Sequence, residues 1–545
     1  MRGLGWGGMI LPLVVAQASP GQEPAADGMP VLSPVTWERL LNSDDEPHNW
    51  LMYHGALDGQ RFSRLDQINR ENVGRLELKW AHQIRQLDRN QTTPLVVDGV
   101  MFITESPSNV TAVDAATGRA YWRYEHPLPD GIRLCCGRNN RGVAILGETL
   151  YMSTNDAHLV AIDARSGSLL WDTEVADHTK GYSKTAAPLV VGDTVVTGIA
   201  GGEFGIRGFI DGYDAATGER RWRTYTVPGP GEPGNETWAG DSWRTGGAPT
   251  WLTGVYDPEL DLIYWGAGNP APDWNGDVRL GDNLYSSSVL ALDRETGKIV
   301  WHFQFTPHDV WDWDAIQVPV LADVELNGEL RKAMLWANRN AFYYLLDRGS
   351  GQFLFGEPFA LQTWANGLDE DGRPILRENV FPTTEGTRVA PIAGGATNWW
   401  SPAYSPRTGF LYVNSFDAEG IYYQRDDEYE EGSIFLGGGH RMPLAADHYK
   451  SAIRAIEATT GEIRWEFPIT PRTRSGVLAT AGGLVWSASV DGYFFALDEE
   501  TGEPLWRMSL GAAPHASPMS YAVGGEQRIV VAMGNVVFVF GLAEE

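Results

Sequence analysis

The stretch Val113-Asp114-Ala115-Ala116-Thr117-Gly118, with Trp122 four residues later, decides how this 545-residue chain is organised. An acidic residue, a glycine four positions on and an aromatic residue eight positions on recur along the sequence. The copies begin at Asp114, Asp163, Asp214, Asp293, Asp347, Glu457 and Asp498. Self-similarity of this kind indicates one structural unit that is used repeatedly.

Each copy predicts a β-hairpin, in which the acidic side chain caps a tight turn, the glycine takes a positive φ and the next strand carries the aromatic residue. Strands are also expected around 78–80, before the first copy, and around 404–413, where a copy would have lost its motif. The apolar runs 528–533 and 536–540 flank Gly534-Asn535 and predict a further hairpin. We expect this hairpin to pair with an early strand and close a ring.

Units of four antiparallel strands around one axis predict an all-β, eight-bladed β-propeller, with the recurring tryptophans packed between neighbouring blades. A linear solenoid is the alternative, but its repeats are shorter and its ends need polar caps. The 22 Trp and 63 Gly suit a large β protein, and only two Cys exclude a disulfide scaffold. We expect one propeller domain over residues 19–545.

Residues 1–18 have the pattern of a secretory signal peptide. Arg2 precedes the apolar stretch 8–15, and Ala16-Gln17-Ala18 forms a cleavage site. The apolar stretch is too short to span a bilayer, although a membrane anchor is the alternative reading. We therefore expect an exported, periplasmic protein without a membrane span, cleaved near Ala18.

The chain is strongly acidic, with 42 basic against 70 acidic side chains and a net charge of −28. Such a surface repels phosphate backbones, so nucleic-acid binding is excluded. The densest acidic run, Asp426–Glu431, is read as a solvated loop, and its alternative role is docking of a basic partner.

Cys135 and Cys136, the only cysteines, are adjacent. A disulfide between them would close a strained ring, because neighbouring Cα atoms are about 3.8 Å apart and the usual disulfide span is longer. Strain of this kind is typical of functional sites. A pair of buried free thiols is the alternative.

The segment Thr306–Asp314 carries three carboxylates within six residues. If the backbone is extended, Asp312 and Asp314 project to one face and repel each other unless a cation or a proton lies between them. Oxygen ligands without clustered Cys or His select a hard ion such as Ca²⁺. Two aspartates that merely cap turns are the alternative.

Two glycine-rich stretches, 201–208 and 266–272, each carry one oxygen side chain that suits a metal, Glu203 and Asn269. With the adjacent cysteines and the Pro-His-Asp-x-Trp-Asp run, in this order, the sequence resembles the quinoprotein alcohol dehydrogenases. These methanol and ethanol dehydrogenases use pyrroloquinoline quinone (PQQ). The resemblance extends over essentially the whole chain after the leader.

The resemblance implies a role for individual residues. Cys135 and Cys136 would form a disulfide against one face of the quinone, with Trp251 stacked on the other, and Arg141 and Thr185 would bind its carboxylates. Arg339 would lie over the reactive carbonyl and take part in catalysis. The remaining implied cofactor contacts are Gln91, Gly201, Gly202 and Asn398, and the implied metal ligands are Glu203, Asn269, Asp312 and Asp314, with Asp312 also the catalytic base.

Asp314 bears on the choice of metal. Members of the resembled family that use Ca²⁺ usually carry a small non-acidic residue at this position, whereas members that use lanthanides carry Asp. A trivalent ion of similar radius gains more from an additional carboxylate than a divalent ion does. The resemblance therefore favours a lanthanide ion, with Ca²⁺ as the alternative.

Three positions depart from the pattern of the resembled family. Gln91 stands where a cofactor-contacting Glu is usual, Ala200 replaces a usual Ser, and Arg474 falls where a Trp is common. An amide can still donate to a quinone carboxylate. The departures bear on substrate preference and affinity more than on the type of reaction.

The implied reaction is the oxidation of a small alcohol to an aldehyde or ketone. No Cys-x-x-Cys-His motif is present, so the electrons would pass to a separate, soluble cytochrome c, and the acidic surface would suit a basic one. The family suggests a homodimer. The alternatives are a PQQ dehydrogenase of aldehydes or sugars and a non-catalytic propeller scaffold, which would need none of the metal-site residues.

Overall fold

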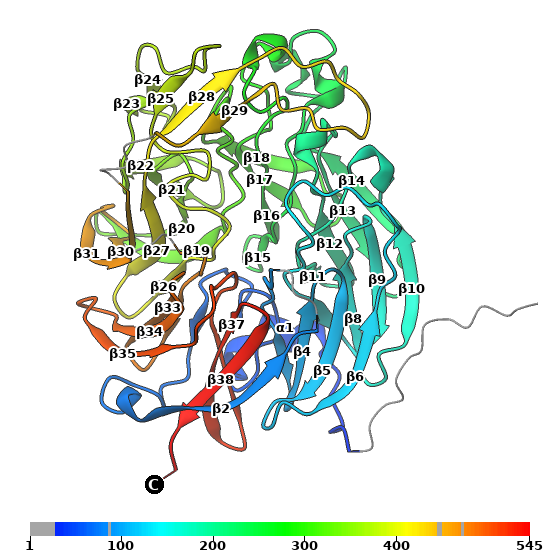
Figure 1. The fold of residues 1–545 in the computed structure, drawn as a ribbon, viewed down its shortest axis with the longest axis vertical. Coiled ribbons are helices and arrows are strands. Elements are labelled where there is room, and N and C mark those ends of the chain that lie inside the picture. Colours follow the sequence, from blue (N-terminus) through cyan, green and yellow to red (C-terminus); the bar gives the residue numbers. More distant parts are fainter. Residues whose placement is uncertain (1–27, 86–88, 444–448, 470–472, 545) are drawn as a thin grey trace, which may run out of the picture.

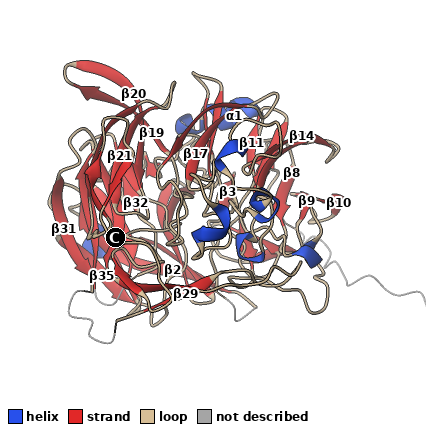
Figure 2. Ribbon diagram, turned by 90° about the horizontal axis from the view of Figure 1, so that it is seen from above, coloured by secondary structure: helices blue, strands red, loops and turns tan. Residues whose placement is uncertain are grey.

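The computed structural model describes residues 28–85, 89–443, 449–469 and 473–544, so the predicted leader 1–18 lies outside the described residues. Nearly all regular structure in them is β-strand. The helical elements are short: α1 (Trp37–Leu41) and the 3₁₀ turns η1 (Ser43–Asp45), η2 (Val73–Arg75), η3 (His178–Lys180), η4 (Gly202–Phe204), η5 (Asn235–Thr237), η6 (Ser242–Thr245) and η7 (Gly276–Arg279). Figure 2 shows how little space they occupy among the strands. No helix of the described residues has the length and apolar character needed to cross a membrane.

Most strands form antiparallel sheets of four, and the chain completes one sheet before it begins the next (Figure 1). In spatial order these are β3 (Leu95–Val97), β4 (Val100–Glu105), β5 (Asn109–Asp114) and β6 (Ala120–Glu125); β7 (Ala144–Leu146), β8 (Thr149–Ser153), β9 (His158–Asp163) and β10 (Leu169–Glu174); β11 (Leu189–Val191), β12 (Thr194–Gly198), β13 (Phe209–Asp214) and β14 (Arg220–Tyr225); β15 (Val255–Asp257), β16 (Leu262–Gly266), β17 (Ser288–Asp293) and β18 (Ile299–Gln304); β19 (Val320–Leu326), β20 (Glu329–Ala337), β21 (Phe342–Asp347) and β22 (Phe353–Pro358).

The later sheets are less regular. One contains β26 (Ala403–Ser405), β27 (Phe410–Asp417), β30 (Lys450–Glu457) and β31 (Ile463–Ile469); the next contains β32 (Leu478–Thr480), β33 (Leu484–Ala488), β34 (Tyr493–Asp498) and β35 (Pro504–Ser509), with β1 (Phe62–Ser63) added parallel to β32. Two small inserted sheets contain β23 (Ala365–Leu368) with β24 (Pro374–Leu376), and β25 (Thr387–Val389) with β28 (Gly420–Gln424) and β29 (Gly438–Arg441).

The ring is closed by strands from the two ends of the described chain. The early strand β2 (Leu76–Gln83) pairs antiparallel with β38 (Val536–Leu542), which continues into β37 (Glu526–Met533) and β36 (Met519–Val523). Figure 1 shows blue β2 beside red β38. The expected pairing of the last hairpin with an early strand is confirmed, and the fold is an all-β propeller.

The repeated motif forms the turn between the last two strands of each sheet that contains it. In the first copy, Asp114 Oδ1 accepts hydrogen bonds from the backbone N–H groups of Ala116 (2.8 Å) and Thr117 (2.9 Å). Gly118 has a φ of +74°, which a residue with a Cβ adopts only with strain. The predicted hairpin, with its acidic cap and its glycine, is confirmed.

The recurring tryptophan connects neighbouring sheets. Trp122 is buried, and its Nε1 donates to the carbonyl oxygen of Ala164 in the next copy, 3.1 Å away. Its ring lies on Gly167 so closely that a Cβ there would be 2.6 Å from the indole. The same contact joins Trp80 with Gly118, Trp171 with Gly218, Trp222 with Gly297, Trp301 with Gly351 and Trp465 with Gly502. Each glycine therefore serves both the turn and the docking of the preceding tryptophan.

One expectation about the repeats is wrong. Residues 404–413 do not form a separate copy that has lost its motif, because β26 and β27 share a sheet with β30 and β31 and hence with the Glu457 copy. The reason is an insertion between the second and third strands of this sheet. It carries β28, the acidic run Asp426–Glu431 and β29, and it separates strands that pair in space.

Candidate active site

A cavity of about 280 Å³ collects loop residues from widely separated parts of the chain. Most residues predicted for the site line it: Gln91, Cys135, Cys136, Arg141, Thr185, Gly201, Glu203, Trp251, Asp312, Asp314, Arg339 and Asn398. The departures Ala200 and Arg474 line it as well. Gly202 and Asn269 do not line the cavity. Both are buried beside it: Gly202 in η4 next to Glu203, and Asn269 with its backbone N–H 2.7 Å from Asp314 Oδ1.

The adjacent cysteines form part of the wall next to Glu203. Their Sγ atoms lie 2.6 Å apart, and Cys136 Sγ is 3.5 Å from Glu203 Oε1. The hydrogen bond with Cys136, burial and the nearby Glu203 raise the pKa of Cys135 well above its usual value. For Cys136 the bond with Cys135 lowers the pKa, but burial and Glu203 outweigh it. The disulfide stays a prediction.

Asp309 shapes the turn that presents the two other aspartates of its segment. Its carboxylate accepts hydrogen bonds from the backbone N–H groups of Trp311 and Trp313, both at 2.9 Å. The two indoles stack with centroids 4.7 Å apart and are fully buried. The backbone is not the extended strand considered above, since Asp312 has a φ of +60°. The turn nevertheless brings both Asp312 and Asp314 to the cavity.

Asp314 is the centre of a hydrogen-bond network. Its Oδ2 accepts from Trp251 Nε1 at 3.1 Å and lies 3.0 Å from Arg339 Nη2. Arg339 Nη1 also donates to the Asp312 carbonyl oxygen at 2.8 Å and lies 3.3 Å from Asp312 Oδ1, and Nη2 donates to Asn398 Oδ1 at 3.2 Å. Burial lowers the pKa of Arg339, but Asp314 and Asp312 raise it above its ordinary value overall. Arg339 is therefore a fixed cation among carboxylates.

The carboxylates around Asp314 outnumber the cations beside them. Burial raises the pKa of Asp312 well above its usual value, and Asp314, Asp273 and Glu203 add to this increase while Arg339 opposes it. Burial and the charge of Asp314 likewise raise the pKa of Glu203. Crowded, buried carboxylates of this kind are stable as anions only beside further positive charge.

Asp273 belongs to this cluster and was missed in the sequence. It is 2% exposed, and one of its carboxylate oxygens, Oδ1, has no hydrogen-bond partner. Burial, Glu203 and Asp314 raise the pKa of Asp273 well above its usual value. The available signal was its position, four residues after Asn269 in the same loop.

The cavity wall also contains a buried cation, Arg141. Arg141 is 3% exposed and stacks between two indoles, with its Cζ 5.0 Å from the Trp251 centroid and 4.8 Å from that of Trp399. Its Nη1 donates to Thr185 Oγ1 at 2.6 Å, and no carboxylate of the described residues pairs with it. Burial lowers the pKa of Arg141 to about 10, so it remains charged at neutral pH.

Several lining residues were not assigned to the site from the sequence: Arg89, Leu134, Gly137, Asn139, Ser183, Gly394, Trp399, Trp400 and His515. Trp399 and Trp400 directly follow Asn398, a predicted site residue, and this position in the sequence could have identified them. Arg89 and His515 precede strands at opposite ends of the chain, and no local motif marks them.

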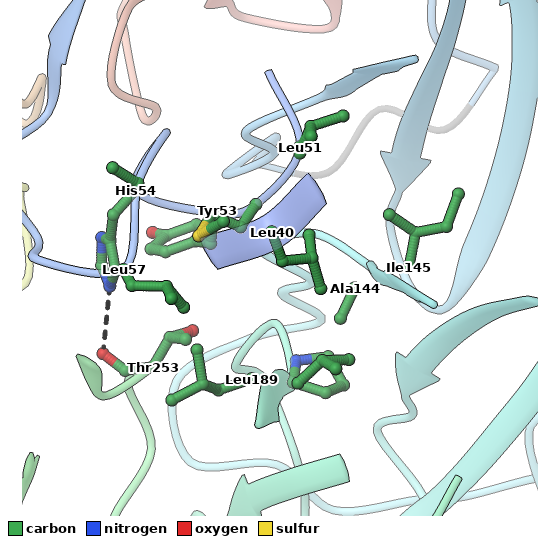
Figure 3. A pocket seen from close by; sticks show the side chains of 13 residues that line it. Leu40, Leu51, Tyr53, His54, Leu57, Ala144, Ile145, Leu189 and Thr253 are labelled. Carbon is green, nitrogen blue, oxygen red and sulfur yellow. Dashed lines mark hydrogen bonds between the residues drawn. The ribbon is translucent and has the colours of Figure 1, made fainter. Parts of the chain in front are cut away.

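A second cavity, drawn in Figure 3, lies near α1 and is mostly apolar. Its volume is only about 10 Å³. His54 Nε2 lies 3.3 Å from the Thr253 carbonyl oxygen, and burial lowers the pKa of His54 to about 3, so the ring is neutral. This cavity is too small for a cofactor, and His54 has a packing role there.

Known proteins resemble this chain over most of its length. The family model for the β-propeller domain of PQQ-dependent glucose, ethanol and alcohol dehydrogenases matches residues 50–357 and 468–529. The quinoprotein alcohol dehydrogenase PedH of Pseudomonas putida is 40% identical over 526 residues, which cover 92% of this chain and 88% of that protein. A quinoprotein ethanol dehydrogenase of Pseudomonas putida is 35% identical and covers 96% of this chain and 90% of its own length.

Solved structures give the same picture. A europium-containing methanol dehydrogenase superposes with a TM-score of 0.88 at 31% identity, over 93% of this chain and all of that one. The quinohemoprotein alcohol dehydrogenase ADHIIG of Pseudomonas putida HK5 superposes with a TM-score of 0.89 at 34% identity, over 95% of this chain and 84% of that one. With the fold and the cavity described above, these similarities show that the chain belongs to the family of PQQ-dependent quinoprotein alcohol dehydrogenases.

Proposed function

We propose that this protein oxidises small primary alcohols to aldehydes, and secondary alcohols to ketones, with PQQ and one metal ion bound in the cavity. The observation that carries the proposal is the division of charge within the cavity. Glu203, Asp312 and Asp314 gather at one end, and the buried Arg141 lies without a carboxylate partner elsewhere in the wall. A flat polyanion would pair with Arg141, and a cation bound beside it would pair with the carboxylates.

The residues present fit PQQ. Two buried polar atoms of the wall, Arg141 Nε and Gln91 Oε1, have no hydrogen-bond partner in the protein. Such orphaned groups are costly unless a ligand satisfies them. Arg141 and Thr185 would hold carboxylates of the cofactor, and Trp251 with the two cysteines would supply its apolar walls. We propose that Cys135 and Cys136 are joined by a disulfide in the exported protein.

The residues also fit a hard cation. Glu203, Asp312 and Asp314 offer only oxygen ligands, Asn269 could add an amide oxygen, and Arg339 alone does not balance the carboxylates that surround it. We propose a lanthanide ion in preference to Ca²⁺, because the carboxylate of Asp314 favours the ion of higher charge. The similarity to a europium-containing methanol dehydrogenase supports this choice.

When bound, the quinone supplies a two-electron acceptor and the cation supplies a Lewis acid. The protein supplies position, charge and a base. Asp312 lines the cavity and would accept the hydroxyl proton of the alcohol. Arg339 holds Asp312 by its carbonyl oxygen and its carboxylate, and so fixes the direction of that base. The guanidinium would also stabilise negative charge that develops beside it.

We also propose a single catalytic domain that works in the periplasm. Each of the eight larger sheets would be one blade of a single propeller domain over residues 19–545. The protein would be exported to the periplasm with cleavage near Ala18, and it would pass its electrons to a separate, basic cytochrome c through its acidic surface.

The test is reconstitution of metal-free protein with PQQ and either La³⁺ or Ca²⁺, followed by dye reduction with primary alcohols, aldehydes and sugars. Asp312→Asn should lower kcat by about 10² to 10⁴ while PQQ binding, measured by fluorescence quenching, persists. Asp172→Asn is a matched control, because Asp172 pairs with His158 outside the cavity. Unchanged turnover in Asp312→Asn contradicts the assignment, and a preference for sugars contradicts the substrate class.

A further inference from the structure

Three basic side chains line one side of the cavity without carboxylate partners. Arg89, Arg474 and His515 come from distant parts of the chain and all line the cavity. Among the described residues, none of the three makes an ion pair. Burial, and then the charges of Arg474 and Arg89, lower the pKa of His515 to about 4. The pKa of Arg474 is lowered by burial and by Arg89.

Arg89 and Arg474 are exposed side chains that line the same cavity. The protein has 28 more acidic than basic side chains, and several of its other arginines have carboxylate partners, such as Arg223 with Asp211 at 2.7 Å and Arg348 with Asp257 at 2.6 Å. Two neighbouring arginines without such a partner repel each other, and an anion bound between them would remove that repulsion.

The neighbouring residues also lack a balancing charge. Gln91 lines the same cavity as an amide, where the resembled family usually has a glutamate, and its Oε1 is buried without a partner. His515 Nδ1 is a second buried polar atom without a hydrogen-bond partner. Relative to the family pattern, Gln91 removes a negative charge and Arg474 adds a positive one. Both changes make this part of the wall more attractive to an anion.

We propose that Arg89, Arg474 and His515, with Gln91 beside them, form a carboxylate-binding subsite in the cavity. This inference rests on the proposed function and extends it. The planar guanidinium groups suit bidentate binding of a carboxylate, and His515, neutral at pH 7, would add a hydrogen bond rather than charge. The carboxylate comes either from the cofactor or from an alcohol substrate that carries one, such as an ω-hydroxycarboxylate.

The test uses the full chain with Arg89→Gln, Arg474→Gln and the double variant. Arg507→Gln is the matched control, because Arg507 is an exposed arginine over Tyr493 and does not line the cavity. In the first arm, PQQ is titrated into metal-free protein by fluorescence quenching at low and high salt. If the cofactor supplies the carboxylate, the Kd of the double variant rises about 10-fold to 100-fold and depends less on salt.

In the second arm, protein saturated with PQQ and La³⁺ oxidises 1-butanol and 4-hydroxybutyrate. If the substrate supplies the carboxylate, the double variant loses about 10-fold or more of kcat/KM for 4-hydroxybutyrate and little for 1-butanol. A double variant that matches Arg507→Gln in both arms overturns the subsite and leaves the proposed function intact. Wild-type protein that binds no PQQ overturns both the proposed function and this subsite.

Discussion

Replacement of Asp314 by serine should change the metal preference of the site and weaken the fold around it. The Asp314 carboxylate accepts from the Asn269 backbone N–H at 2.7 Å and from Trp251 Nε1 at 3.1 Å, and it lies 3.0 Å from Arg339. A serine is too short to replace these contacts. Two buried N–H donors left without acceptors cost about 1–3 kcal/mol each. Arg339 keeps Asp312 and Asn398 as partners.

The effect on metal choice follows from charge. A carboxylate about 4 Å from a unit charge contributes about 4 kcal/mol at an effective dielectric constant near 20. A lanthanide carries one more positive charge than Ca²⁺, so loss of the Asp314 carboxylate should lower the ratio of La³⁺ to Ca²⁺ affinity by about 10² to 10³. Both ions should bind less tightly, with the larger loss for La³⁺.

The assay is a titration of metal-free, PQQ-loaded protein with each ion, followed by tryptophan fluorescence, together with urea unfolding of the metal-free protein. Asp314→Asn separates charge from size, because it keeps an acceptor for Asn269 but carries no charge. We expect the shift in metal preference in both variants and the greater loss of stability in Asp314→Ser. If the affinity ratio changes by less than about threefold in both, the charge argument for a lanthanide is refuted.

Three further outcomes follow from the structure. Gly167→Ala should lower the free energy of unfolding by about 1–3 kcal/mol in urea titrations. Gly167 has a φ of +72°, and a Cβ there would lie 2.6 Å from the Trp122 ring. A variant as stable as the wild type would contradict the docking argument. Burial lowers the pKa of Lys184 from 10.5 to about 7. Between pH 7 and pH 10.5 the folded state therefore binds fewer protons than the unfolded state, and the free energy of unfolding rises with pH. Lys184→Met should therefore stabilise the protein at pH 6 and lose this advantage by pH 10 in thermal unfolding, and a gain independent of pH would speak against it. Asp273→Asn should weaken La³⁺ binding in the titration above without changing PQQ binding, and an unaltered La³⁺ affinity would remove Asp273 from the metal environment.

The local features of the fold could be predicted from the sequence because each depends on residues close together. The acid, the glycine and the aromatic residue of the repeat define a turn and a docking contact, and both occur at Asp114 and Trp122. The wrong assignment at 404–413 arose because an insertion separates two strands of one sheet. Sequence spacing alone does not reveal that β27 pairs with β30 across such an insertion.

The candidate site was predictable where a motif carried it. Asp312 and Asp314 stood out as a cluster, but the roles within the segment did not: Asp309 organises the turn through two backbone N–H groups, and only the structure distinguishes it from the others. Asp273 was missed because a single aspartate in a loop has many uses, and its significance comes from burial beside Glu203 and Asp314.

The carboxylate-binding subsite of Arg89, Arg474 and His515 is the part of the cavity that depends most on closure of the ring. Arg89 follows β2, and His515 precedes β36, so the pairing of β2 with β38 brings segments from the two ends of the chain to one side of the cavity. The acidic part is built from loops between residues 203 and 314, within a continuous run of sheets. Weakening the β2–β38 pairing should therefore disturb anion binding before metal binding, because only the anion depends on both ends of the chain. The subsite of Arg89, Arg474 and His515 is thus a consequence of ring closure as well as of the residues themselves.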